Sequence, residues 1–113
     1  MGDSNERRRS PRVRAETYAS LEVEGLNAND QGFGIVVDVS TSGIRVRTPQ
    51  PPHNGQRVIV RVAVGEELYR VRAHVARVTR TDDGTYDVGL AYSTLDRLKV
   101  QFLEAFFQEN PIS

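Results

Sequence analysis

Two short clusters of polar residues in this chain have the types and spacing needed to bind an anion. The first is an R-x-x-x-R motif near the start, in which Arg8 and Arg12 stand four residues apart and Arg7 and Arg9 lie beside them. A guanidinium group is planar, permanently charged and able to donate two parallel hydrogen bonds, which suits the oxygens of a phosphate. The same spacing is also common in solvated basic tails, so the motif by itself allows either a phosphate site or a plain arm.

The second cluster is a D-x-S-x-x-G motif, about thirty residues later, made by Asp38, Ser40 and Gly43. Asp and Ser side chains bond readily to nearby backbone amides, and glycine adopts the positive φ that many turns require. The motif therefore predicts a tight turn between two apolar strands, with a positive φ at Gly43. A carboxylate, a hydroxyl and a glycine at the edge of such a turn can also contact a ligand.

Composition and charge favour one small cytoplasmic domain. The 113 residues are the usual length of a single domain and include no cysteine, which excludes disulfides and thiol chemistry. No apolar run approaches the roughly 20 residues that span a bilayer. The 15 basic and 15 acidic residues cancel, so net charge gives no basis for bulk binding to nucleic acid. Arginine nevertheless supplies fourteen of the basic residues, and five of these lie in the first fourteen positions.

No group of residues has the pattern of an enzyme active site. The two histidines, His53 and His74, fall in a Pro-rich loop and inside a predicted strand, and neither has a nucleophile or metal ligands at a familiar spacing. The paired acids at 66–67 and 82–83 occupy predicted hairpin tips, where water solvates them. We therefore expect no catalytic residues, no metal and no cofactor.

The polar, basic composition of residues 1–12 predicts a flexible Arg-rich arm, and hydrophobic periodicity predicts one β-rich domain over 13–113. Alternating apolar residues indicate six strands, joined in part by hairpin turns at 65–67 and 82–84. These strands cover 13–23, 33–39, 44–48, 57–64, 68–81 and 86–92, and the fifth has an apolar face that extends to Arg77. Leucines and phenylalanines at spacings of three and four then predict an amphipathic helix over about 94–109, packed on one barrel opening. The pattern is typical of an antiparallel barrel or sandwich.

Together, in this order on a small β-rich domain, the two motifs resemble the PilZ family of bacterial cyclic di-GMP receptors. The resemblance runs from about Glu6 to the C-terminal helix and includes the segment 88–92, which is similar to a late glycine-containing strand of the family. It implies a six-stranded antiparallel barrel with a C-terminal helix, binding cyclic di-GMP on its outer surface.

The same resemblance implies roles for individual residues. The arginines of the arm would contact the phosphates and the exposed edge of guanine, while Asp38 and Ser40 would contact a guanine and Gly43 would let the ligand approach the backbone. An arginine at the position of Arg7 is associated in the family with an intercalated ligand dimer, although Arg7 could equally be a solvated charge. Ligand binding would order the arm and signal to a downstream protein.

Two other functions are compatible with a small barrel. One is a PilZ-like module that binds proteins without a ligand, although both motifs stand intact here. The other is a barrel that binds RNA or single-stranded DNA. Such proteins stack bases on clustered strand aromatics beside a basic groove. The strand aromatics of this chain, among them Tyr18, Phe33 and Tyr69, show no such cluster in the sequence.

Overall fold

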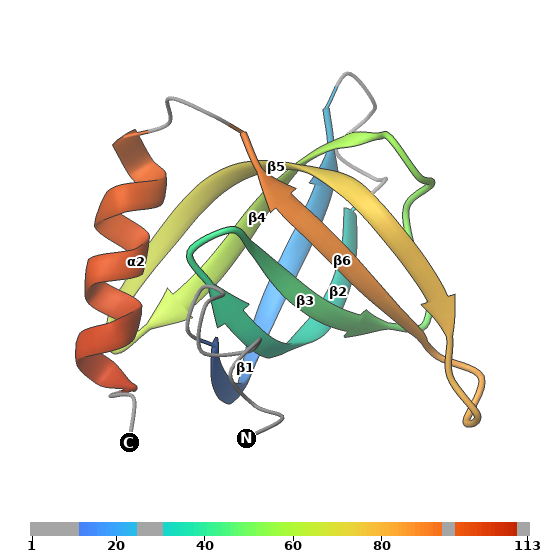
Figure 1. Ribbon diagram of the computed structural model, residues 1–113, viewed down its shortest axis with the longest axis horizontal. Helices are drawn as coiled ribbons and strands as arrows, with labels where there is room; N and C mark the ends of the chain where they lie inside the picture. The colour runs from blue at the N-terminus through green and yellow to red at the C-terminus, as the bar shows by residue number, and fades with distance from the viewer. Residues whose placement is uncertain (1–11, 25–30, 94–96, 111–113) are drawn as a thin grey trace, which may run out of the picture.

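The computed structural model describes residues 12–24, 31–93 and 97–110. Over these residues six antiparallel strands form a closed barrel in the order β1-β2-β3-β6-β5-β4, and one helix follows (Figure 1). The elements are β1 (Arg12–Val23), β2 (Gln31–Ser40), β3 (Gly43–Thr48), β4 (Arg57–Val64), β5 (Glu67–Arg80), β6 (Tyr86–Tyr92) and α2 (Arg97–Glu109). The predicted barrel with a C-terminal helix is confirmed, and β1 begins at Arg12, one residue before the predicted strand. The remainder of the predicted arm, residues 1–11, lies outside the described residues.

Alternation of valine with polar residues builds the barrel wall. In β4 the side chains of Val58, Val60 and Val62 are fully buried, whereas Arg57 faces outward. The two predicted hairpin turns are present, and in each a glycine takes the positive φ that side chains disfavour, with φ of 61° at Gly65 and 89° at Gly84. Local pattern and turn chemistry therefore agree along this half of the chain.

Helix α2 stands beside β4 and β5 and adds its aromatic face to the core (Figure 1). Phe102 and Phe106 are almost completely buried with their ring centroids 5.6 Å apart, and the partly buried Phe107 packs edge-on against Phe106. The predicted helix start falls on residues 94–96, outside the described part of the chain. No described helix is long and apolar enough to cross a membrane.

The pairing of the strands shifts by one residue at three places. The shifts lie in β1 between Arg14 and Thr17, in β2 between Val36 and Asp38, and in β5 between Val75 and Arg77. An extra residue in one strand turns the next side chain to the opposite face of the sheet. Arg77 is consequently exposed, and the prediction that it continues the inward face of its strand is wrong. Asp38 likewise faces away from the barrel interior instead of following Val36 into the core.

Candidate ligand-binding site

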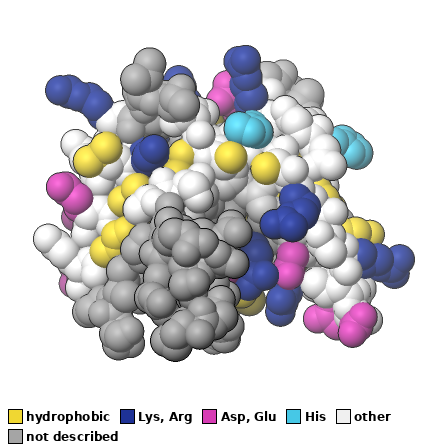
Figure 2. Space-filling model, in the orientation of Figure 1, with side chains coloured by type: hydrophobic (Ala, Val, Ile, Leu, Met, Phe, Trp, Pro, Cys, Tyr) yellow, Lys and Arg dark blue, Asp and Glu magenta, His cyan; other side chains and the backbone are white. Residues whose placement is uncertain are grey.

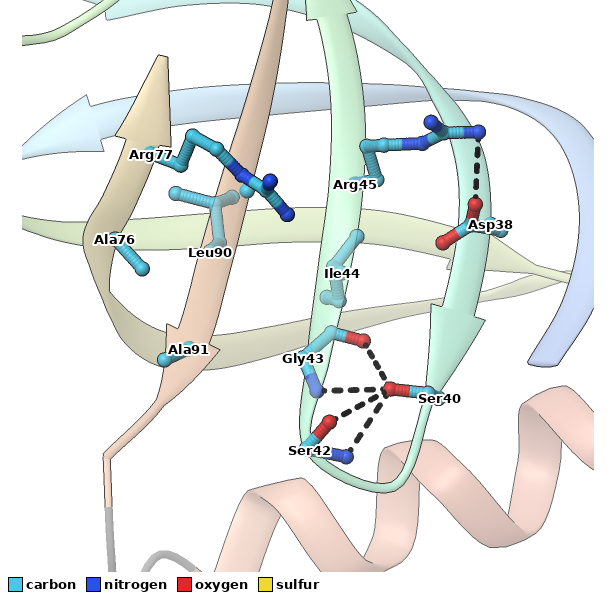
Figure 3. A pocket seen from close by; sticks show the side chains of 11 residues that line it. Asp38, Ser40, Ser42, Gly43, Ile44, Arg45, Ala76, Arg77, Leu90 and Ala91 are labelled. Atoms are coloured by element: carbon cyan, nitrogen blue, oxygen red, sulfur yellow. Dashed lines mark hydrogen bonds and ion pairs between the residues drawn. The ribbon is translucent and has the colours of Figure 1, made fainter. Parts of the chain in front are cut away.

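An open pocket of about 230 Å³ lies on the outside of the barrel where β2, β3, β6 and β5 run side by side (Figure 3). All three residues of the D-x-S-x-x-G motif line it, together with Ser42, Arg45 and Arg77. The structure thus brings the predicted Asp38, Ser40 and Gly43 together and adds two arginines that sequence reasoning did not select.

Ser40 organises the turn between β2 and β3. Its Oγ accepts hydrogen bonds from the backbone N–H groups of Ser42 and Gly43, each at 3.2 Å, and lies 3.0 Å from the Oγ of Ser42 (Figure 3). The buried hydroxyl of Tyr92 on β6 donates a hydrogen bond to the Ser40 carbonyl at 2.9 Å. Burial raises the pKa of Tyr92. The turn is therefore held by its own serine, as predicted, and by a β6 residue that the local sequence does not reveal.

Gly43 is needed for a different reason from the one predicted. It does not have a positive φ and instead begins β3, paired with Ala91 of β6. A Cβ at this position would lie 2.2 Å from the carbonyl oxygen of Leu90, which is far inside van der Waals contact. Close approach of β6 therefore requires glycine here, and the prediction of a turn glycine with positive φ is wrong.

Asp38 forms an ion pair with Arg45. Its Oδ2 lies 2.9 Å from Nη2 of Arg45, and only 9% of the Asp38 side chain is exposed. The Nε of Arg45 is buried and makes no hydrogen bond to any residue in the described ranges. A buried carboxylate normally needs such a partner. Arg45 could have been selected from the sequence. It lies two positions after Gly43 in a predicted strand, and alternation along that strand places its side chain on the outer face.

Strand register places the charged residues in one row across the barrel. Asp38 pairs with Arg45, Arg45 with Gly89, and Gly89 with Arg77. Neighbouring strands lie about 4.8 Å apart, so Gly89 leaves a gap between two arginines whose backbones stand roughly 10 Å from each other. Figure 3 shows the Arg77 side chain reaching over β6 toward β3.

The residues that line the pocket carry one more positive than negative charge, and Asp87 beside them also contacts Arg45, with its Oδ2 3.9 Å from Nη1. The lining includes two arginines and one carboxylate, and Arg77 makes no ion pair with a residue that the structure describes. On the face in Figure 2, basic side chains gather in this region with acidic ones interspersed. An anion with a flat or compact group could lie between the two arginines. At Gly89, which stands between them, no side chain would obstruct it. The geometry suits binding of an anionic ligand.

The predicted arginine cluster is only partly within the described residues. Arg7, Arg8 and Arg9 lie outside them. The backbone of Arg12, the first residue of β1, pairs with Ser40, and Arg14 pairs with Asp38. β1 therefore brings the end of the R-x-x-x-R motif to the edge of the pocket.

Comparison with a family model identifies the family of this chain. Residues 6–109 match the model of the PilZ domain. The chain belongs to the PilZ family. No curated protein sequence matches it significantly.

Solved PilZ structures share the fold of this chain. The PilZ domain of YcgR from Escherichia coli, solved with c-di-GMP, has a TM-score of 0.72 at 16% identity over 91% of both chains. MotI/DgrA, an inhibitor of motility from Bacillus subtilis, has a TM-score of 0.68 at 16% identity over 88% of this chain and 49% of its own. The PilZ domain of CeSA from a cellulose-synthesizing bacterium has a TM-score of 0.63 at 17% identity over 89% and 100%. This PilZ chain therefore spans about half the length of MotI.

Proposed function

We propose that this PilZ protein is a cytoplasmic receptor for cyclic di-GMP, which binds in the pocket between Arg45 and Arg77 and is covered from outside by the N-terminal arm. The observation that carries the proposal is the cross-strand row of Asp38, Arg45, Gly89 and Arg77 beside the β1 residue Arg12. Cyclic di-GMP has two phosphates and two guanines. The row has cations, a carboxylate and, at Gly89, a space without a side chain. The relative YcgR, whose PilZ domain was solved with c-di-GMP, has the same fold.

The chemistry of each side chain supports a specific role. Arg8 and Arg12 can each hold two phosphate oxygens or the O6 and N7 atoms of guanine. Ionised Asp38 only accepts hydrogen bonds, so it matches the N1–H and N2 donors of guanine. Ser40 would add a hydroxyl contact at the same guanine.

Arg7 and Arg9 supply further positive charge next to the motif. An extra cation and a stacking plane at Arg7 would help to hold a ligand dimer, whose four phosphates repel one another. The proposal for Arg7 is therefore an intercalated dimer, with two ligand molecules bound for each protein chain.

The size of the pocket supports a role for the arm. Its volume of about 230 Å³ is below the roughly 300–1,000 Å³ of pockets that enclose a drug-sized ligand. A second segment must cover the rest of the ligand, and β1 leads the arm to the pocket edge. Charge-assisted hydrogen bonds contribute roughly 1.5–3 kcal/mol each, and ordering the backbone costs about 1–2 kcal/mol per residue. With six to eight of each, the two contributions largely offset, and stacking of the guanines brings the net affinity near micromolar, or about −8 kcal/mol.

Isothermal titration of the purified chain with cyclic di-GMP tests the proposal, with GTP and cyclic di-AMP as controls. We expect saturable binding of cyclic di-GMP alone, and a ligand-to-protein ratio near two for the dimer. A ratio near one would contradict the dimer and leave the receptor intact. Absence of both heat and thermal shift at high ligand concentration would overturn the receptor and favour a ligand-independent protein-binding module.

Substitution of the arm separates a binding role from a structural one. Arg8→Ala or Arg12→Ala should abolish measurable binding and leave the melting temperature almost unchanged. A large loss of thermal stability would mean that the arm serves the fold. Once ordered by the ligand, the arm would alter the surface offered to a downstream protein, a population shift driven by differential affinity.

A further inference from the structure

The outer wall of the barrel carries large apolar side chains that do not join the core. Tyr18 on β1 is 80% exposed, Phe33 on β2 is 68% exposed, and Leu68 on β5 is 64% exposed. Ile35 and Ala63 are exposed as well. Single exposed apolar residues are common, but a contiguous set on neighbouring strands usually marks a binding surface.

Strand register makes these residues contiguous. Tyr18 lies directly opposite Ile35, and Phe33 is two residues from Ile35 on the same face of β2. On the other side of β1, the hydroxyl of Thr17 donates to the carbonyl of Ala63, and Ala63 lies opposite Leu68. The apolar residues therefore form one row from β2 through β1 and β4 to β5.

A basic strip borders this row on β4 and β5. Its members are the outward-facing residues Arg57, Arg61, Arg70 and Arg72. Arg61 lies directly opposite Arg70, an arrangement of like charges that destabilises a sheet. Glu22 of β1 offsets one of these charges through an ion pair of 2.6 Å with Arg61. Arg57 and Arg70 form no ion pair with another residue of the described ranges, and the four arginines of the strip outnumber the neighbouring carboxylates of Glu22 and Glu24.

We propose that this surface binds an acidic protein segment that also presents apolar side chains. We call it the Tyr18 face and define it by the apolar row Tyr18, Phe33, Ile35, Ala63 and Leu68 and the basic strip Arg57, Arg61, Arg70 and Arg72. The barrel is closed, with no free strand edge among the described strands. A partner must therefore dock through side chains rather than add a strand. The apolar row would contact the hydrophobic residues of the partner segment, and the basic strip would pair with the carboxylates of that segment.

The charge and composition of the Tyr18 face disfavour other occupants. A second copy in a two-fold contact would offer the arginines a surface that is itself positive. A nucleic acid would match the arginines and could stack on Tyr18 and Phe33. It would leave aliphatic groups such as Ile35 and Leu68 without suitable partners, however, and would meet the carboxylate of Glu22. An acidic, partly apolar protein segment satisfies both halves of the surface.

The Tyr18 face is separate from the ligand pocket, and the inference does not rest on the proposed ligand. The pocket lies over β3 and β6 and the adjoining parts of β2 and β5. β1 belongs to both regions, since the backbone of Arg12 pairs with Ser40 at the pocket and Tyr18 lies on the face. The register shift between Arg14 and Thr17 separates these two parts of the strand.

Site-specific photo-crosslinking in cells that produce the full chain tests the proposal. A benzophenone amino acid replaces Phe33, and a control chain carries it at Val100, an apolar residue of α2 that is 54% exposed. We expect a crosslink from position 33 and none to the same partner from position 100. Mass spectrometry should map it to a protein segment rich in Asp and Glu with interspersed apolar residues. Crosslinks to a second copy, to lipid or to nucleic acid, or none at all, would overturn the proposal.

Charge reversal then tests the contacts with a synthetic peptide of the mapped segment. Arg70→Glu should weaken peptide binding at least tenfold by fluorescence anisotropy, and Phe33→Ala should do the same. Arg70→Glu places a carboxylate opposite Arg61, so the melting temperature should not fall and lost binding cannot be ascribed to unfolding. Unchanged affinity in both variants would show that the crosslinked segment does not use this surface.

Discussion

Replacing Arg77 by alanine should weaken the binding of cyclic di-GMP roughly 10- to 150-fold without unfolding the barrel. The register shift in β5 turns Arg77 outward and places it opposite Gly89. There it lines the pocket. In the absence of a ligand, Arg77 has no ion pair with a described residue, so its charge is available for a phosphate.

The magnitude follows from the bond that would be lost. A hydrogen bond to a charged group contributes roughly 1.5–3 kcal/mol, and about 1.4 kcal/mol corresponds to a tenfold change in Kd. The cost to the fold should be small, because exposed substitutions without a structural partner usually change stability by less than about 0.5 kcal/mol. Arg77→Ala should therefore separate affinity from stability.

Isothermal titration and thermal melting of matched variants give the test. Arg80→Ala is the control, since Arg80 is also an exposed arginine of β5 but does not line the pocket. We expect Arg80→Ala to bind like the wild type and Arg77→Ala to bind far more weakly, with equal melting temperatures. If the wild type binds and both variants bind equally well, the ligand does not use this pocket. A lower melting temperature for Arg77→Ala would refute its assignment as a ligand residue alone.

Three further predictions concern the pocket floor, the turn and one hairpin. Gly89→Leu should abolish ligand binding, because a larger side chain fills the gap between the two arginines. It should keep the fold, because a Cβ at this position lies 3.8 Å from its nearest neighbour, which is an ordinary contact. Titration measures the binding and circular dichroism the fold. Tyr92→Phe leaves the buried Ser40 carbonyl without its donor and should destabilise the fold by about 1–3 kcal/mol in urea unfolding. Because burial raises the pKa of Tyr92, the wild type should also lose stability above about pH 10, and Tyr92→Phe should lose less. Hydrogen bonds from Thr81 and Thr85 lower the pKa of Asp83, so Asp83→Asn should lower the melting temperature at pH 7. The difference in melting temperature between variant and wild type should shrink below about pH 4. Asp82→Asn is the control and should have little effect.

Much of the fold could be predicted from local sequence patterns, in which the interacting residues lie within a few positions of each other. Alternation of valine with polar residues predicted β4 and β6 with their observed bounds, and glycine at the hairpin tips predicted the turns at Gly65 and Gly84. The hydrogen bonds of Ser40 within its own turn were predictable for the same reason, since donor and acceptor lie two or three residues apart. The two motifs also pointed to the family from sequence alone.

The site itself depends on contacts between strands that are far apart in the chain. One extra residue in β2 and one in β5 turn Asp38 and Arg77 outward, and period-two alternation cannot reveal such a bulge because it arises from pairing with another strand. The need for glycine at position 43 comes from the carbonyl of Leu90 on β6, not from a local turn. The amino-acid sequence thus determined the strands, the hairpins and the motif residues, whose causes are local. Only the closed barrel decided which charges line the outer pocket, because that depends on register across four strands.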